Sequence, residues 1–403
     1  MSINILFTNG RPITKQNGVE VVTDVLAKYL QKAGFQVFFM HLRKYFSPVY
    51  QTDNVYFFPD ENTGSKTNID FYHSFLKEKN INLIINQSAE WIGESAAFLN
   101  TGTQPVIKLS CYHNRPLRNV DSFTGFFPKQ IPGLKSSIAK GIRMLLYPYL
   151  SGRELDKIRK KFVFLQQNNR FVVLLSAKFI PQLTRWHEID PAKFRAIPNP
   201  NSFTDIPFIP SSEKKKQILY VGRLMYEQKN TFLLLHIWKK LYKQFPDWEL
   251  ILCGDGPQRT LVESEVQSMP NVKVIGFQDP KPYYQTASIL CLTSTYEGFG
   301  LVLTESMQYS MIPVAYNSYE AITDIIEDGV NGFIIQPYSV NKYVQCLSKL
   351  MNMSDGKRDI ITTNGWQSVK KFDIDNVMNQ WIEFIRQIFN ENENGNKTEQ
   401  PAF

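Results

Sequence analysis

Apolar runs of five or six residues alternate with amphipathic stretches from the start of the chain. Residues 3–8 and 35–40 are typical of buried strands. Between them, residues 19–33 have a helical spacing of apolar side chains, and Gly34 ends the helix. The side chains that share one face of this helix are Val19, Val22, Leu26 and Leu30. This strand–helix–strand opening predicts a parallel, doubly wound sheet with right-handed crossovers.

The same alternation occurs on both sides of a polar stretch with a proline-rich start, Ile197-Pro-Asn-Pro200, that is typical of an interdomain hinge. Further buried strands are expected at 81–85, 106–110, 171–176, 217–221, 248–253, 272–276 and 289–293. A chain of 403 residues is long enough for two domains. We therefore expect an α/β fold of two Rossmann-like, doubly wound parallel-sheet domains, at residues 1–205 and 206–375, followed by a C-terminal helix at 376–390 and a disordered polar tail at 391–403.

Composition adds expectations about compartment and charge. The four cysteines are scattered without metal-ligand spacing, the N-terminus enters a strand directly, and no apolar run reaches about 18 residues. We therefore expect a cytoplasmic protein with reduced cysteines and no membrane-spanning helix. Residues 1–205 carry 26 Lys+Arg against 15 Asp+Glu, whereas residues 206–403 carry 19 against 22. The basic half favours an anionic partner, such as a membrane surface, a nucleic acid or a phosphorylated substrate.

Residues 133–162 interleave basic side chains with apolar and aromatic ones. The basic residues are Lys135, Lys140, Arg143, Arg153, Lys157, Arg159, Lys160 and Lys161. This combination favours a helix lying in an anionic membrane surface. The alternative is a helical hairpin that packs on the domain and leaves a solvated basic face.

Doubly wound sheets bind ligands beyond the carboxyl ends of their strands. In the first half, this rule singles out Gly10, Gly18, Asn86 and His113. A lone histidine is more often structural or exposed, but His113 stands just past an expected buried strand, which favours a function.

The segment from Ser294 to Glu305 follows an apolar run and contains a glycine-rich turn, Glu297-Gly-Phe-Gly300, before a helix from about Leu301. Glycines let a ligand approach the backbone, and the first amides of a helix lack internal partners and favour negative charge. The turn therefore predicts a phosphate site. The carboxylates of Glu297 and Glu305 can accept hydrogen bonds from hydroxyls, so a nucleotide-sugar fits. The alternative is an ordinary helix start with a glutamate in its first turn.

Two cations, Arg223 and Lys229, fall in the loop after the expected strand at 217–221. At a strand's carboxyl end, such a pair can hold a diphosphate. Gly254-Asp-Gly256 lacks the third glycine of a dinucleotide fingerprint, so we expect a tight turn there. Asp373-Ile-Asp375 is interpreted as a helix cap, and we predict no metal site.

Together these pieces resemble the retaining glycosyltransferases of family 4 (glycosyl transferases group 1), which have the GT-B fold of two facing Rossmann-like domains. The resemblance covers nearly the whole chain. Its motifs are Asn17-Gly-Val-Glu20, Ile197-Pro-Asn199, Val221-Gly-Arg-Leu224 with Lys229, Gly254-Asp-Gly-Pro257, Glu297-Gly-Phe-Gly-Leu-Val-Leu-Thr-Glu305 and Glu327-Asp-Gly-Val-Asn-Gly-Phe333.

The resemblance implies roles for the residues of the second domain. Arg223 and Lys229 would bind the donor diphosphate and stabilise the departing nucleotide. Glu297 would contact the hydroxyls of the transferred sugar, and Glu305 would contact the ribose. The backbone amides that would hold phosphate and sugar are those of Gly298, Phe299, Gly300 and Leu301.

For the first domain, the resemblance implies that Gly18 admits the phosphates and that His113 lies next to the reacting sugar. Family members are metal-independent, so the nucleotide-sugar co-substrate is the only small molecule expected besides the acceptor. The last helix of such enzymes crosses back onto the first domain, consistent with the apolar side chain of Trp381.

For the acceptor, we expect a saccharide, lipid-linked, used in surface polysaccharide synthesis at the inner face of the cytoplasmic membrane. This expectation rests on the segment 133–162, which lies in the basic half of the chain. Two alternatives remain open: an enzyme of the same fold that acts on a free small molecule, and a non-catalytic scaffold or nucleic-acid binder. Intact Glu297, Glu305 and Arg223 argue against the second alternative, so no nucleic-acid partner is expected.

Overall fold

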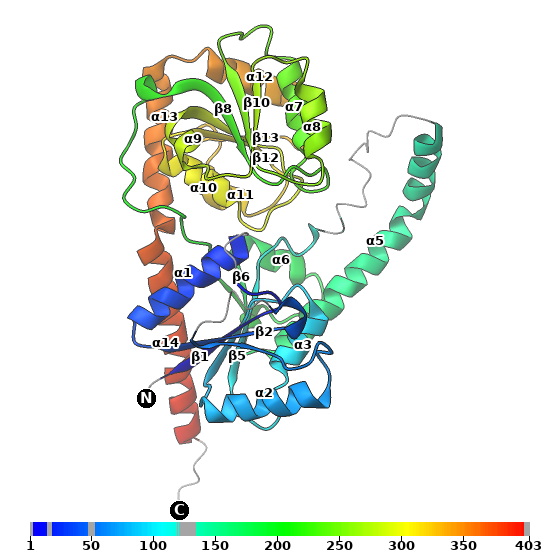
Figure 1. The fold of residues 1–403 in the computed structure, drawn as a ribbon, viewed down its shortest axis with the longest axis vertical. Helices are drawn as coiled ribbons and strands as arrows, with labels where there is room; N and C mark the ends of the chain where they lie inside the picture. The colour runs from blue at the N-terminus through cyan, green and yellow to red at the C-terminus, as the bar shows by residue number, and fades with distance from the viewer. Residues whose placement is uncertain (1–2, 14–17, 47–52, 119, 121–133, 399–403) are drawn as a thin grey trace, which may run out of the picture. The chain divides into compact units, whose positions relative to one another are not determined.

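The structure is a computed structural model that describes residues 3–13, 18–46, 53–118, 120 and 134–398 (Figure 1). Residues 134–148, 150 and 392–398 are described by their backbone alone. The chain forms two compact units: unit 1 comprises Met1–Asn114, Lys157–Pro200 and Ile374–Phe403, and unit 2 comprises Arg115–Asp156 and Asn201–Asp373. The chain therefore changes unit at 114/115, 156/157, 200/201 and 373/374. The sequence pattern had placed Arg115–Asp156 in the first domain, whereas the structure groups them with unit 2.

Unit 1 contains a seven-stranded parallel sheet with the strand order β3-β2-β1-β4-β5-β6-β7. Its strands are β1 (Asn4–Asn9), β2 (Gln36–His41), β3 (Val55–Phe57), β4 (Leu83–Asn86), β5 (Ile107–Tyr112), β6 (Phe171–Leu174) and β7 (Phe194–Ala196). Its main helices are α1 (Gly18–Lys32), α2 (Lys66–Glu78), α3 (Ile92–Leu99), α6 (Ile180–Leu183), α14 (Ile374–Thr398) and the second part of α5 (Leu134–Asn168).

Alternation along β1 creates two apolar layers, one on each face of this sheet, because successive strand side chains point to opposite faces. Ile5 and Phe7 pack in one cluster with residues of α1 and α14. Leu6 packs in another cluster with residues of α2 and α3, such as Phe75 and Phe98. Unit 1 therefore has helices on both faces of a parallel sheet, as predicted.

The last helix, α14, packs against unit 1 beside α1 (Figure 1). Its buried side chains in the shared cluster are Val377, Met378, Trp381, Ile385 and Ile388. The helix continues to Thr398, so residues 391–398 are helical where the sequence pattern suggested disorder. Glu391 accepts hydrogen bonds from Gln387 (3.0 Å) and Arg170 (3.3 Å), which explains why the helix extends past Asn390. Residues 399–403 lie outside the described residues.

Residues 134–168 form one continuous helix, α5, rather than a hairpin. Near its end, Ile158, Phe162 and Leu165 are buried, and Arg159 pairs with Glu188 at 2.5 Å. Residues 157–162 of the predicted membrane-binding segment therefore pack on unit 1, because their apolar side chains belong to its core. Residue 133 of that segment lies outside the described residues.

Unit 2 contains a six-stranded parallel sheet with the strand order β10-β9-β8-β11-β12-β13. The strands are β8 (Lys215–Val221), β9 (Glu249–Cys253), β10 (Val272–Gly276), β11 (Ala287–Leu292), β12 (Ile312–Tyr316) and β13 (Phe333–Ile335). The helices are α7 (Thr231–Lys239), α8 (Arg259–Val266), α9 (Lys281–Thr286), α10 (Leu301–Gln308), α11 (Ile322–Ile325), α12 (Val340–Met351) and α13 (Asp355–Ser368). This is the second Rossmann-like domain that the sequence predicted.

Candidate functional site

Two loops meet at the carboxyl edge of the unit 2 sheet, because β8 and β11 are neighbouring strands. Threonine side chains join the two loops. Thr293 Oγ1 donates to the carbonyls of Lys229 and Asn230, both at 3.2 Å, and Thr295 Oγ1 donates to the carbonyl of Glu227 at 2.7 Å. The backbone N–H of Thr295 also donates to the carbonyl of Gln228 at 2.7 Å. These bonds fix the position of Lys229 relative to the turn that carries Glu297.

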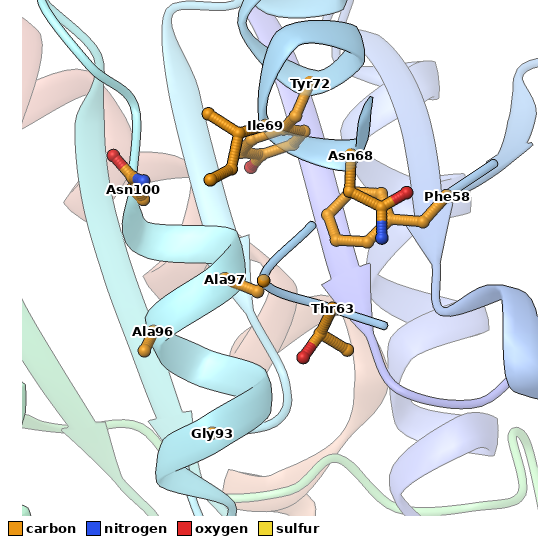
Figure 2. Close-up of a pocket in the computed structure, with 10 residues that line it drawn as sticks. Phe58, Thr63, Asn68, Ile69, Tyr72, Gly93, Ala96, Ala97 and Asn100 are labelled. Atoms are coloured by element: carbon orange, nitrogen blue, oxygen red, sulfur yellow. The ribbon is translucent and has the colours of Figure 1, made fainter. Parts of the chain in front are cut away.

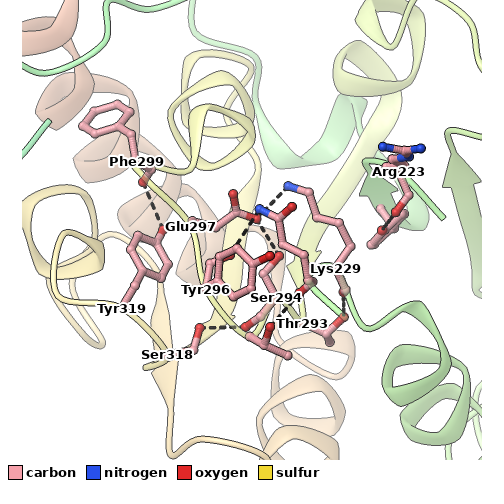
Figure 3. Close-up of polar contacts among 12 residues, drawn as sticks. Arg223, Lys229, Thr293, Ser294, Tyr296, Glu297, Phe299, Ser318 and Tyr319 are labelled. Atoms are coloured by element: carbon pink, nitrogen blue, oxygen red, sulfur yellow. Dashed lines mark hydrogen bonds and ion pairs between the residues drawn. The ribbon is translucent and has the colours of Figure 1, made fainter. Parts of the chain in front are cut away.

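Lys229 and Glu297 form an ion pair with an Nζ–Oε1 distance of 2.6 Å, as Figure 3 shows. Their side chains are only 16% and 10% exposed, so water screens the pair weakly. Ser294 Oγ donates to the same Oε1 atom at 2.6 Å. Among the described residues, no group donates a hydrogen bond to Oε2 of Glu297. One carboxylate oxygen is therefore anchored while the other can accept a hydrogen bond from a ligand hydroxyl.

Arg223 lies on the β8 loop, apart from the Lys229–Glu297 pair (Figure 3). Its side chain is exposed, and its guanidinium forms no ion pair with another described residue. Its backbone is fixed, because Tyr220 Oη donates to the Arg223 carbonyl at 3.0 Å. The neighbouring Gly222 is in backbone contact with Gly254, where a Cβ atom would stand 1.9 Å from the Gly222 carbonyl oxygen. A rigid loop therefore presents a cation to the solvent.

The glycine turn before α10 has the backbone conformation that the sequence suggested. Gly300 is the N-cap of α10 with φ +95°, and a Cβ there would lie 2.4 Å from the Tyr319 hydroxyl oxygen. That hydroxyl donates to the Phe299 carbonyl at 3.1 Å, while the Phe299 ring is buried edge-on against Phe372. The backbone N–H groups of residues 298–301 donate to no acceptor among the described residues. The turn is therefore held by the carbonyl and the ring of Phe299, and the amides of residues 298–301 remain available to an anion.

Glu305 lies one turn inside α10 and is held by two hydroxyls. Tyr284 Oη donates to its Oε2 at 2.7 Å, and Ser202 Oγ donates to its Oε1. Burial raises the pKa of Glu305, while the two hydroxyl donors and the charge of Lys229 act in the opposite direction. The sequence predicted Glu305 but missed Ser202 and Tyr284, because no spacing in the chain links residues 202, 284 and 305.

The carboxyl edge of the unit 1 sheet carries an imidazole, amides and hydroxyls that hydrogen-bond to one another. His113 follows β5, and its Nε2 lies 2.5 Å from Oε1 of Gln87, which follows β4. Burial lowers the pKa of His113 to about 4, opposed by the charge of Glu90, so the imidazole is neutral at pH 7. Beneath it, Asn86 Nδ2 donates to the hydroxyls of Ser95 (3.1 Å) and Ser110 (3.0 Å).

The two glycines predicted in unit 1 have different surroundings. A Cβ at Gly10 would lie 2.1 Å from Glu94 Oε2, so close packing explains this glycine. Gly18 is exposed and begins α1. Asn17, which precedes it in the quoted motif, lies outside the described residues.

A cavity of about 230 Å³ lies between α2 and α3 of unit 1 (Figure 2). It is lined by Phe58, Thr63, Gly64, Asn68, Ile69, Tyr72, Gly93, Ala96, Ala97 and Asn100. The Asn68 amide group already donates to the carbonyls of Asp60 and Asn62. The cavity contains none of the predicted site residues.

In the described part of the chain, no group of three or more His, Cys, Asp or Glu side chains is arranged to hold a metal ion. The same residues include no helix with the length and apolarity needed to span a bilayer.

Comparison with known proteins identifies part of the chain. Residues 202–367 match the family model "Glycosyl transferases group 1". These residues are a glycosyl transferases group 1 domain. The domain contains Arg223, Lys229, Glu297 and Glu305, and therefore every predicted site residue of unit 2.

Two curated relatives are similar to this chain over about half of its length. An uncharacterized glycosyltransferase of Haemophilus influenzae is 28% identical over 224 residues, which cover 52% of this chain and 61% of the relative. A Campylobacter jejuni alpha-1,4-N-acetyl-D-galactosaminyltransferase, named for a diNAcBac-PP-undecaprenol-linked saccharide, is 27% identical over 202 residues, covering 49% of this chain and 56% of the relative. The matched part thus spans only about three fifths of these relatives.

The solved structure of Anabaena Alr3699/HepE in complex with UDP and glucose resembles the whole chain. Its TM-score is 0.70 at 16% identity, with 96% of this chain and 100% of that chain covered. At this identity the likeness shows the fold. Two Rossmann-like parallel-sheet domains, one of them a group 1 domain, constitute the GT-B fold that the sequence predicted.

Proposed function

We propose that the chain is a retaining glycosyltransferase of family 4 that transfers a sugar from a nucleotide-sugar to a saccharide acceptor without a metal ion. The observation that carries the proposal is the Lys229–Glu297 pair, held at neighbouring strand ends beside the available amides of residues 298–301. Cations and amides suit a diphosphate, and the second oxygen of Glu297 suits a sugar hydroxyl. The relatives named as glycosyltransferases and the UDP complex of the Anabaena structure support it.

The chemistry follows from the charges that develop in the reaction. The bond between the sugar anomeric carbon and the phosphate oxygen breaks, and its electron pair remains on the phosphate. The acceptor oxygen attacks the anomeric carbon from the same face, and its proton passes to the leaving phosphate oxygen, which gives retention. Arg223, Lys229 and the turn amides stabilise the negative charge on the departing diphosphate. Glu297 and a neutral His113 bind the sugar as positive charge develops on it.

The test is Arg223→Ala. The exposed guanidinium has no ion pair within the described residues, so its removal leaves the fold unchanged. If Arg223 stabilises the leaving group, its loss lowers kcat by roughly 10²-fold or more while nucleotide affinity changes far less. Kinetics of transfer and calorimetric titration with UDP, after a thermal-shift screen of UDP-, GDP- and ADP-sugars, give both quantities. Equal losses in rate and in binding would contradict this role.

For the acceptor, we propose a lipid-linked saccharide of surface polysaccharide synthesis, reached from the inner face of the cytoplasmic membrane through α5. The name of the Campylobacter relative, with its undecaprenol-linked saccharide, supports this substrate class. Residues 134–156 of α5 precede the part that packs on unit 1 and carry four of the basic side chains named above. Radiolabelled transfer to a lipid extract, compared with free sugars, tests the substrate. Flotation with anionic liposomes tests whether the protein binds an anionic membrane surface. Flotation that does not depend on lipid charge would contradict the proposed role of α5.

A further inference from the structure

Trp91 is the one exposed tryptophan of the chain. All six tryptophans lie in the described part, and the other five are buried or half-buried, whereas Trp91 is 63% exposed. It stands at the N-cap of α3, five residues after the end of β4. A large aromatic side chain in solvent gives up most of the stabilisation that its burial would provide. Trp91 lies at the edge where doubly wound sheets bind ligands, so ligand recognition can account for its exposure.

The loop that carries Trp91 is fixed at both ends. The Trp91 N–H donates to the Ser88 carbonyl at 2.9 Å, and the Trp91 carbonyl accepts from the Ser95 N–H at 2.9 Å. Ser88 Oγ in turn accepts from the Gly10 N–H at 2.9 Å. The indole N–H donates to no acceptor among the described residues. The backbone is therefore rigid while the indole ring projects into solvent, so binding a ligand there requires little ordering of the loop.

Hydrogen-bonding side chains lie on the loops after β4 and β5, and the loop after β4 also carries Trp91. These strands are neighbours, with Asn86 opposite Ser110. Two bonds join their loops: His113 Nε2 to Gln87 Oε1 at 2.5 Å, and Asn114 Nδ2 to Glu90 Oε1 at 2.6 Å. Trp91 directly follows Glu90 in the chain, so its loop belongs to the same rigid edge as these amide, carboxylate and imidazole groups.

This combination matches the chemistry of a sugar ring. A pyranose has a face of C–H groups that packs flat on an aromatic ring and an edge of hydroxyls that hydrogen-bonds to carboxylates and amides. The carboxylate of Glu90 disfavours an anionic ligand at this position and accepts hydroxyl protons readily. A neutral saccharide therefore suits this edge better than a phosphate or a nucleic acid does.

We propose that Trp91 is the stacking platform for a sugar ring of the acceptor, with Glu90 and Asn114 binding the hydroxyl edge of that ring. This proposal rests on the glycosyltransferase function proposed above and assigns the acceptor subsite of unit 1. According to this proposal, binding of the acceptor depends on the Trp91 side chain, and binding of the donor does not.

The test compares Trp91→Ala and Trp91→Phe with Ile360→Ala, a control that removes an equally exposed apolar side chain, 65% exposed, from α13. The acceptor probes are methyl glycosides of glucose, galactose and N-acetylglucosamine and their disaccharides. Trp91→Ala raises the acceptor KM roughly ten-fold, or abolishes its saturation, while the donor KM stays within about two-fold. Trp91→Phe keeps a ring and recovers most of the acceptor affinity, and the control matches wild type.

A second readout separates this proposal from the function on which it rests. Saturation-transfer NMR with the same glycosides shows contacts from the ring C–H protons in the wild type that disappear in Trp91→Ala. An unchanged acceptor KM in Trp91→Ala, or no glycoside binding by the wild type, overturns the platform. A wild type that neither transfers nor hydrolyses any nucleotide-sugar overturns the enzyme function. Ring contacts that depend on Trp91 would stand even then.

Discussion

The two parallel sheets have the same construction and opposite chemistry at their carboxyl edges. In unit 2, the edge holds a carboxylate and an ammonium 2.6 Å apart, with an exposed guanidinium on the loop after β8, apart from that pair. In unit 1, the edge holds a neutral imidazole, amides, hydroxyls and the carboxylate of Glu90, with an exposed indole. Both edges are cross-linked by side chains from neighbouring loops, so each is preorganised. The difference lies in the side chains that each edge presents, not in rigidity.

This difference matches what each half of a glycosyl transfer demands. A diphosphate leaving group develops negative charge, which only cations and oriented amides stabilise strongly. An acceptor sugar is neutral and is recognised by shape and hydrogen bonds. The same scaffold can therefore serve both, because the loops at the strand ends carry the chemistry.

The largest expected effect comes from breaking the charged edge with Lys229→Ala. This change removes the proposed diphosphate ligand and leaves the Glu297 carboxylate, 10% exposed, without its counter-charge. We expect kcat/KM for the nucleotide-sugar to fall roughly 10²–10³-fold, or about 3–4 kcal/mol. Steady-state kinetics with a folded variant, checked by circular dichroism, measure the effect.

Lys216→Ala is the matched control, since Lys216 pairs with Asp247 at 2.5 Å on the surface of the same unit. Those side chains are 58% and 54% exposed, so the pair contributes at most about 1 kcal/mol to stability. We expect wild-type kinetics. A Lys229→Ala variant within roughly ten-fold of the wild type would show that the charged edge is structural.

The next effect concerns the stability of unit 1 and appears when the pH is lowered. Burial lowers the pKa of His41, which ends β2 in unit 1, to about 4, opposed by its hydrogen bond to the Asn9 carbonyl and by the charge of Glu20. The His41 imidazole is therefore protonated below about pH 6.5 in the unfolded chain, but only below about pH 4 in the folded chain. The free energy of unfolding must fall as pH decreases through this window, by up to about 3 kcal/mol from His41.

Denaturant titrations at several pH values, for the wild type and for His41→Phe, isolate this contribution. The phenylalanine removes the titrating group and keeps the stacking against Phe39. The variant should lose part of the acid sensitivity. His187→Phe serves as a control, because the His187 side chain is 93% exposed. Identical slopes for wild type and His41→Phe would refute the assignment.

The smallest effect sharpens the role of Glu305. Tyr284→Phe removes the hydroxyl that donates to Oε2 and leaves a buried carboxylate with one donor fewer. We expect nucleotide affinity to fall roughly three- to ten-fold, corresponding to about 1 kcal/mol for one hydrogen bond. Isothermal titration with UDP measures it.

Tyr309→Phe provides a control in the adjacent ring, which stacks on Tyr284 with centroids 5.7 Å apart. The buried Tyr309 hydroxyl has no hydrogen-bond partner among the described residues, so its removal should leave affinity unchanged. Equal effects from both substitutions would assign the change to ring packing and not to Glu305.

The sequence predicted the elements that are long and strongly periodic. Helix α1 begins and ends within one residue of the expected 19–33, and every strand expected by its residue range was located. The buried strand β12 (Ile312–Tyr316) was not among the strands given a range. The strands β3 and β7 were missed, because three residues are too few to establish a period. The helical residues 391–398 were missed as well, since the polar composition conceals the anchoring of Glu391 by Arg170.

For the candidate site, spacing identified Glu297, Lys229 and Glu305, and the structure brings the first two into contact. The partners Ser294, Ser202 and Tyr284 became visible only through packing. Ser202 lies 103 positions from Glu305 in the chain, so no local pattern could have paired them. Sequence motifs thus located the groups that we propose to act on a ligand, and the structure located the groups that hold them.

The position of α14 affects the order in which the protein can be completed during translation. Unit 2 consists of residues that all precede Ile374, whereas part of the apolar layer of unit 1 is synthesised last. A nascent chain released at residue 373 would carry a finished second sheet and a first sheet with one face uncovered. The sheet of unit 2 can therefore be completed before the sheet of unit 1 is covered on both faces.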